Sequence, residues 1–67
     1  MKVKIVVNEE GYFLQDRWGR YLDIRSVDKR KPVFGPVRNN SNAILRVDRA
    51  SIEQVAYHYG LTIVKKF

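Results

Sequence analysis

Between residues 43 and 67 the apolar residues change from a strand-like pattern to a helical period and back again. From Arg49 onward they recur at i, i+3, i+4 and i+7, which places them on one face of a helix. These residues are Ile52, Val55, Ala56 and Tyr59. Asp48 can accept hydrogen bonds from the free N–H groups of the first turn, and Gly60 can adopt the left-handed conformation that ends a helix. The sequence therefore predicts a helix over residues 49–59.

Several other segments have the alternation or the β-branched composition of strands. Turn residues at Gly11 and Gly19 separate the first three of these segments into a meander. The predicted strands are residues 2–7, 12–15, 20–24, 43–47 and 61–64. The predicted fold class is therefore α+β: a small, mostly antiparallel sheet of four to five strands in the order β-β-β-loop-β-α-β, with one helix packed on one face.

The chain is expected to form a single domain over residues 1–67, with a basic loop at about 26–42. Prolines at positions 32 and 36 exclude a central strand from that loop but allow an extended edge segment. With 67 residues and no cysteine, the core has only a small margin of stability and no disulfide to support it. We therefore expect either a monomer or a weak homodimer.

Positive charge is concentrated in one third of the chain. Between residues 17 and 38 there are seven cations and two anions, a balance of +5 within a chain of net charge +6. The cations are Arg17, Arg20, Arg25, Lys29, Arg30, Lys31 and Arg38. Such a concentration favours an acidic protein or a nucleic acid as partner, because it raises the encounter rate with polyanions. The alternative is that the charge serves only solubility.

Aromatic residues are interleaved with these cations. Trp18 and Tyr21 lie beside Arg17 and Arg20, and Phe34 follows the Lys29–Lys31 run. Cations contact phosphates and rings stack on unpaired bases, so this combination suits single-stranded nucleic acid or RNA. The alternative is that the rings pack over the sheet with arginines along their faces. The predicted binding residues are Arg17, Trp18, Arg20, Arg25, Lys29, Arg30, Lys31, Phe34 and Arg38.

The sequence lacks the catalytic and metal-binding residues that most enzyme classes need. The chain has one histidine, His58, and no cysteine, and its serines show no nucleophile motif. Seven scattered carboxylates give no metal-ligand spacing, and the glycines lie too far apart for a phosphate loop. We therefore predict a non-enzymatic protein with no catalytic residue, metal or cofactor.

Two other classes are also disfavoured. Ala56 and Gly60 have the spacing of a helix-turn-helix turn, but the β-branched residues that follow favour a strand over a recognition helix. The N-terminal residues are too few and too charged for a signal peptide, and no apolar run approaches the ~18 residues of a membrane span. The expected location is the cytoplasm, without membrane contact.

One set of positions resembles a known group of proteins. The positions are Tyr21-Leu22, Ala43-x-x-Arg46-Val47-Asp48 and Ile52-x-x-Val55-Ala56-x-x-x-Gly60-Leu61-x-Ile63-Val64. They are similar to a pattern in small bacteriophage-encoded proteins with a β-meander, one helix and a last strand. The layout also resembles that of the small RNA-polymerase inhibitors of T7-type phages, which bind a host protein. The resemblance covers about the last 45 residues and transfers no binding residue.

Two functions are therefore expected. The first is a phage-type modulator, cytoplasmic in its host, that docks through its basic surface on an acidic host protein of the transcription or replication machinery. The second is direct binding of single-stranded nucleic acid or RNA by the basic and aromatic region from Arg17 to Arg38. Acidic proteins and nucleic acids present similar charge to a basic patch, so the sequence leaves both open.

Overall fold

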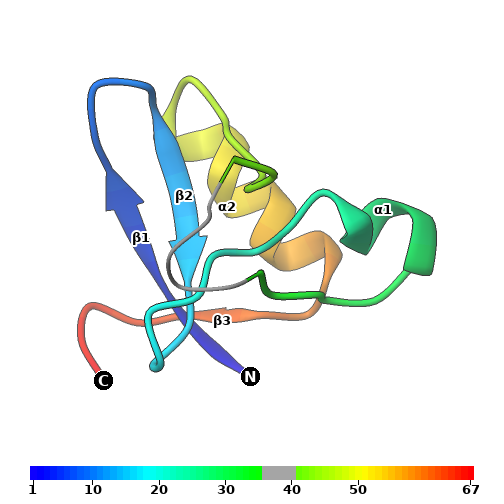
Figure 1. Cartoon of the computed structure of the whole chain (residues 1–67). Coiled ribbons are helices and arrows are strands. Elements are labelled where there is room, and N and C mark those ends of the chain that lie inside the picture. The colour runs from blue at the N-terminus through cyan, green and yellow to red at the C-terminus, as the bar shows by residue number, and fades with distance from the viewer. Residues whose placement is uncertain (36–40) are drawn as a thin grey trace.

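The computed structural model of the chain describes residues 1–35 and 41–67. The described residues form a three-stranded sheet and two helices in a body of 25 × 24 × 23 Å (Figure 1). The elements are β1 (Lys2–Val7), β2 (Tyr12–Gln15), α1 (Arg25–Lys29), α2 (Arg49–His58) and β3 (Thr62–Ile63). β1 is the central strand, with β2 antiparallel on one side and β3 parallel on the other.

The first two predicted strands are confirmed and form a hairpin. The backbones of Asn8 and Gly11 exchange two hydrogen bonds of 2.9 and 3.2 Å, and the Asn8 carboxamide oxygen accepts from the Glu10 N–H at 2.8 Å. Gly11 has a φ of +148°. The turn chemistry predicted for this segment therefore closes the β1–β2 hairpin.

The predicted sheet of four to five strands is wrong, because the described sheet has three. Segment 20–24 does not form a ladder with any one neighbour, and its last residue, Ile24, already has the backbone angles of a helix. Its residues bridge to three different segments: Tyr21 to Gln15, Leu22 to Phe34, and Asp23 to Ala43. Each of these three segments pairs with only one residue of segment 20–24, so no continuous strand forms there.

Segment 43–47 is likewise not a strand, and it makes two isolated bridges, Ala43 to Asp23 and Arg46 to Tyr12. The returning strand is confirmed as β3 but is only two residues long. It pairs parallel to β1, with Lys2 opposite Thr62, so the sheet is mixed and not mostly antiparallel.

A second helix, α1, lies where the sequence predicts a basic loop at 26–42. It has five residues, and the next residue, Arg30, ends it in the left-handed conformation at φ +55°. The prediction of a single helix is therefore wrong for the described chain. In Figure 1, α1 stands to one side of the sheet, away from β1 and β3.

The helix predicted from the hydrophobic period is confirmed as α2. The Asp48 carboxylate accepts from the Ser51 N–H at 2.8 Å, and Gly60 is left-handed at φ +68°. Ile52 and Ala56 are fully buried, while Val55 and Tyr59 pack at the edge of the core. The local signals at both ends of α2 therefore act as expected.

The hydrophobic core lies between α2, the sheet and the extended segments beside β2. Its members are Val3, Leu14, Leu22, Ile44, Ile52, Ala56 and Leu61. Leu22 and Ile44 belong to the segments that form bridges in place of strands, so their side chains contribute to the core even though their backbones do not extend the sheet. None of the helices in the described parts of the chain is long and apolar enough to cross a membrane.

Candidate functional site

The turn after β2 holds Trp18 in a fixed position. Asp16 is 1% exposed, and one of its carboxylate oxygens accepts from the N–H groups of Trp18 and Arg20, each at 2.9 Å. The other oxygen accepts from Arg20 Nε at 2.8 Å. The Gly19 N–H bonds to the Asp16 carbonyl at 3.2 Å, and Gly19 is left-handed at φ +85°. Every bond of this turn is local, so the turn is pre-organised and needs no ligand to form.

Trp18 itself points into solvent and is 63% exposed. Two guanidinium groups lie near its ring, that of Arg20 at 5.3 Å and that of Arg17 at 5.9 Å from the centroid. Phe67, 45% exposed, lies beside the same Arg17 at 6.0 Å, and the Lys4 ammonium is 5.9 Å from the Phe67 ring. We call these five residues the Trp18 platform.

The strand order explains why residues distant in sequence meet there. Gln15, at the end of β2, pairs with Lys4 of β1. On the other side of β1, the Val64 N–H donates to the Val3 carbonyl at 2.9 Å. This bond keeps the C-terminal residues beside β1, so Phe67 can lie near Lys4. Lys4 and Phe67 were not among the predicted binding residues, and no local pattern marks them. Knowledge of the β1–β3 pairing would have been needed to find them.

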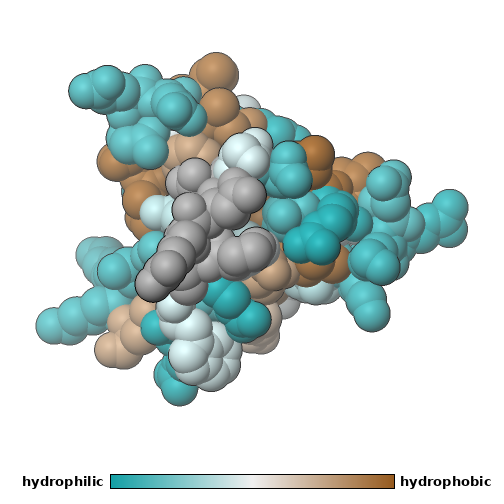
Figure 2. Space-filling model, in the orientation of Figure 1, coloured by the Kyte–Doolittle hydropathy of each residue, from teal (hydrophilic) through white to brown (hydrophobic). Residues whose placement is uncertain are grey.

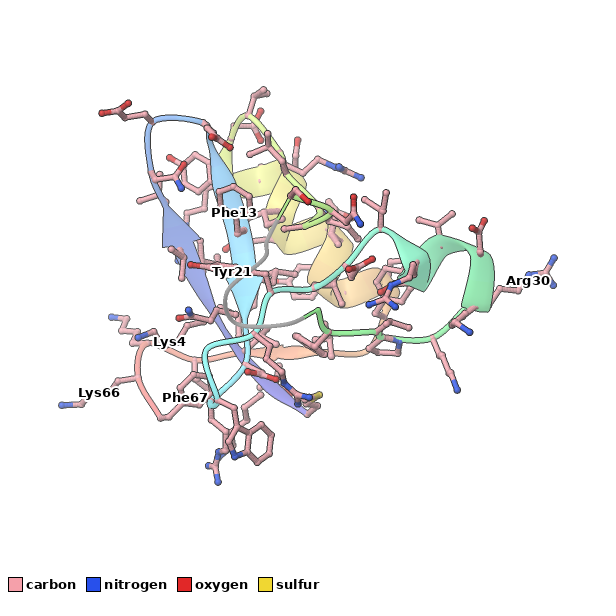
Figure 3. All side chains as sticks on the ribbon, in the orientation of Figure 1. Lys4, Phe13, Tyr21, Arg30, Lys66 and Phe67 are labelled. Atoms are coloured by element: carbon pink, nitrogen blue, oxygen red, sulfur yellow. The ribbon has the colours of Figure 1, made fainter. Side chains whose placement is uncertain are left out.

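The other predicted cations lie elsewhere. Arg30 follows α1 on one side of the molecule, whereas Lys4, Lys66 and Phe67 lie on the other (Figure 3). Figure 2 shows hydrophilic side chains extending on both of these sides. Among the described residues, the cations that the sequence predicted as one surface therefore lie on two separate surfaces.

Two further predicted binding residues, Arg25 and Phe34, already have partners within the described chain, although the Arg25 side chain is 53% exposed. Arg25 is paired with the buried Asp23, Nε to carboxylate oxygen at 3.1 Å. The Arg25 backbone N–H, at 2.8 Å, is the main reason that the pKa of Asp23 lies below its usual value; the Arg25 side chain adds to this, against the effect of burial. Phe34 packs against the core, and Arg38 lies outside the described residues.

Tyr21 packs over the sheet. Its ring contacts the buried Phe13 edge-on, at 5.5 Å between centroids. For Tyr21 the packing alternative therefore holds, whereas Trp18 is largely exposed and only the Arg17 and Arg20 part of that alternative applies to its ring. The two aromatic residues of this region thus have different roles, and only Trp18 is placed to meet a ligand.

The chemistry available at the platform is binding chemistry. It offers two partly exposed aromatic rings, three cations, and one carboxylate, that of Asp16, whose oxygens are already occupied. Among residues 1–35 and 41–67, no group of three or more His, Cys, Asp or Glu side chains could hold a metal ion.

Comparisons with protein-family models, curated proteins and solved structures find no match to this chain. They therefore do not bear on the resemblance to small phage-encoded proteins, which stays a prediction.

Proposed function

We propose that the protein binds single-stranded nucleic acid through the Trp18 platform. The observation that carries this proposal is an exposed tryptophan, 63% accessible, beside the guanidinium groups of Arg17 and Arg20. Stacking of an unpaired base on an aromatic ring contributes about 1–3 kcal/mol and depends little on which base it is. Binding of this kind selects single strands over duplexes, whose base faces are covered by their neighbours.

The cations of the platform suit a strand that runs across it. Lys4 and Arg17 flank Phe67 at 5.9 and 6.0 Å, and Arg17 also neighbours Trp18, so charge surrounds both rings. A base stacked on either ring would have its phosphate within reach of a cation. The Asp16 carboxylate does not repel the strand, because Arg20 pairs with it and it is buried.

The first test compares the parent chain with Trp18→Ala in their affinity for labelled oligo-dT and oligo-rU. The oligonucleotides are about 12 nucleotides long, which is within the site sizes of single-strand binders. We expect the substitution to weaken binding about tenfold, near the lower end of the range for one stacked base. Fluorescence anisotropy measures the affinity, and quenching of Trp18, the single tryptophan of the chain, reports stacking directly.

Matched controls separate stacking from charge. Trp18→Phe keeps a ring and should retain most of the affinity, while Lys29→Ala removes a charge from the α1 side and should have little effect. Because Arg20 is paired with Asp16, Lys4 and Arg17 are the cations expected to contact phosphates, and they should give a slope of about −1.4 in log K against log salt, at about −0.7 per contact. Equal affinity for duplex DNA, or an unchanged affinity in Trp18→Ala, would reject the platform as a stacking site.

A further inference from the structure

A groove opens on the other side of the molecule, between α1 and α2. Its volume is about 1020 Å³. One wall comes from α1 and the turn after it, and the other comes from α2. The residues that define the two walls are Val27, Arg30 and Lys31, facing Ser51, Val55 and His58.

The groove combines an apolar surface with charge of one sign. Val27 is 64% exposed although it is aliphatic, and the groove is also lined by Ile44 of the core. Of the described residues that line it, three are cations, Arg30, Lys31 and Arg46, and none is a carboxylate. Lys29, the last residue of α1, is a cation that is not among the lining residues.

The wall formed by the α1 segment is held in place from inside the protein. Ser26 is fully buried, and its hydroxyl accepts from the Val33 N–H at 2.9 Å and donates to the Val33 carbonyl at 3.2 Å. The Asp23 N–H bonds to the same carbonyl at 2.8 Å. These bonds close the segment between residues 26 and 33 into a loop, so Val27, Arg30 and Lys31 keep their places without a ligand.

We propose that this groove binds an acidic amphipathic helix of a partner protein. The apolar face of such a helix would cover Val27 and Val55, and its carboxylates would meet Arg30, Lys31 and Arg46. An open groove with cations on long, exposed side chains suits an extended surface better than a small acid, which needs polar groups that converge on it. A nucleic acid would meet the same charges but would leave the apolar surface uncovered.

This inference does not rest on the proposed nucleic-acid binding. It uses different residues on a different side of the molecule, and each site is tested with its own ligand and its own variants.

The probe is a fluorescein-labelled helical peptide of about 15 residues, long enough for a helix to be marginally stable in water, with Leu on one face and Glu on the others. Its control is a peptide of the same composition in an order that gives no apolar face. At near-physiological salt we expect the amphipathic peptide to bind about tenfold more tightly than the control.

The variants compare equal changes of charge inside and outside the groove. Lys31→Glu should weaken the binding of the peptide about tenfold. Lys29→Glu, two residues away and not in the lining, should change the affinity for the peptide less than about threefold. Arg30→Gly removes another lining cation at a left-handed position that glycine prefers, so it should weaken binding without loss of thermal stability. Together these variants separate binding from folding.

Four outcomes would overturn the proposal. Equal binding of the two peptides would show that the apolar surface is not used, and equal loss in Lys29→Glu and Lys31→Glu would show a general effect of net charge. If oligo-dT displaced the peptide, and if Lys31→Glu also weakened the binding of oligo-dT by a similar factor, the groove would be assigned to nucleic acid. Self-association in sedimentation that Lys31→Glu abolishes would assign it to a second copy of the chain.

Discussion

Two glycines with positive φ have different surroundings. An added Cβ at Gly11 would lie 2.5 Å from the Arg46 carbonyl oxygen and 2.6 Å from a Leu45 methyl group. That carbonyl cannot easily move, because Arg46 and Tyr12 exchange two backbone hydrogen bonds. An added Cβ at Gly60 would meet nothing within 4 Å. Gly11 is thus required for a close approach of two backbones as well as for its conformation, whereas Gly60 is required for conformation alone.

We therefore expect Gly11→Ala to lower the free energy of unfolding by about 3 kcal/mol, from backbone strain and overpacking together. Gly60→Ala, the matched control, should cost about 1 kcal/mol, since only the left-handed conformation is penalised. Urea unfolding followed by circular dichroism measures both. Equal losses in the two variants would show that the contact between Gly11 and Arg46 is not tight in solution.

The buried polar residues show what a residue-level prediction from sequence can and cannot find. The sequence indicated the turn at Gly19, which Asp16 begins, but nothing in it indicated that the Asp16 carboxylate is buried. Asp23 entered the sequence analysis only as one of the two anions in the charge balance, and it is buried and paired with Arg25. Ser26 had no predicted role and closes the α1 loop. Each role depends on a partner that only the fold supplies.

At the scale of elements, local signals predicted α2 and the β1–β2 hairpin, because their caps, turn residues and periods lie within a few residues. Segment 20–24 has the composition of a strand, but whether a strand forms depends on distant partners, and here they are three separate segments. The helix α1 gave no signal, since its N-cap, Ile24, makes no side-chain cap bond and Arg30 occupies the left-handed position where glycine is usual.

The cap of α2 predicts a dependence of stability on pH. The Ser51 backbone N–H holds the pKa of Asp48 below its ordinary value. A carboxylate with a lowered pKa in the folded state stabilises the fold above the unfolded value of ~3.9, and this contribution is lost as the pH falls through the folded pKa.

We therefore expect the parent chain to lose stability relative to Asp48→Asn as the pH is lowered from about 5 to about 3, because asparagine caps a helix without titrating. Thermal unfolding by circular dichroism at several pH values measures this difference. Asp23 titrates in both chains, so its contribution cancels. A difference in melting temperature that does not vary with pH would contradict the assignment of Asp48 as a charged cap.

At the scale of the whole molecule, the charge balance of residues 17–38 was read from the sequence as one surface, but the fold divides those of its cations that the structure describes. The turn at Trp18 and the α1 loop leave the sheet region on different sides, so neighbours in sequence become distant in space. The reverse holds for Phe67, which meets Arg17 through the β1–β3 pairing. Composition predicted the kind of residue at each site, but the topology determines which residues act together.

Two separate surfaces predict that two ligands bind at once. The body is 25 × 24 × 23 Å, and charges are screened over about 8 Å at physiological salt, so an acidic peptide in the α1–α2 groove should change the affinity of oligo-dT for the Trp18 platform less than about twofold. Anisotropy titrations of the labelled oligonucleotide with and without saturating peptide measure this. Trp18→Ala should weaken the binding of the oligonucleotide alone, and Lys31→Glu should weaken the binding of the peptide alone. Mutual exclusion of the two ligands would instead restore the single basic surface that the sequence suggested, since a ligand that competes from the opposite side must span both.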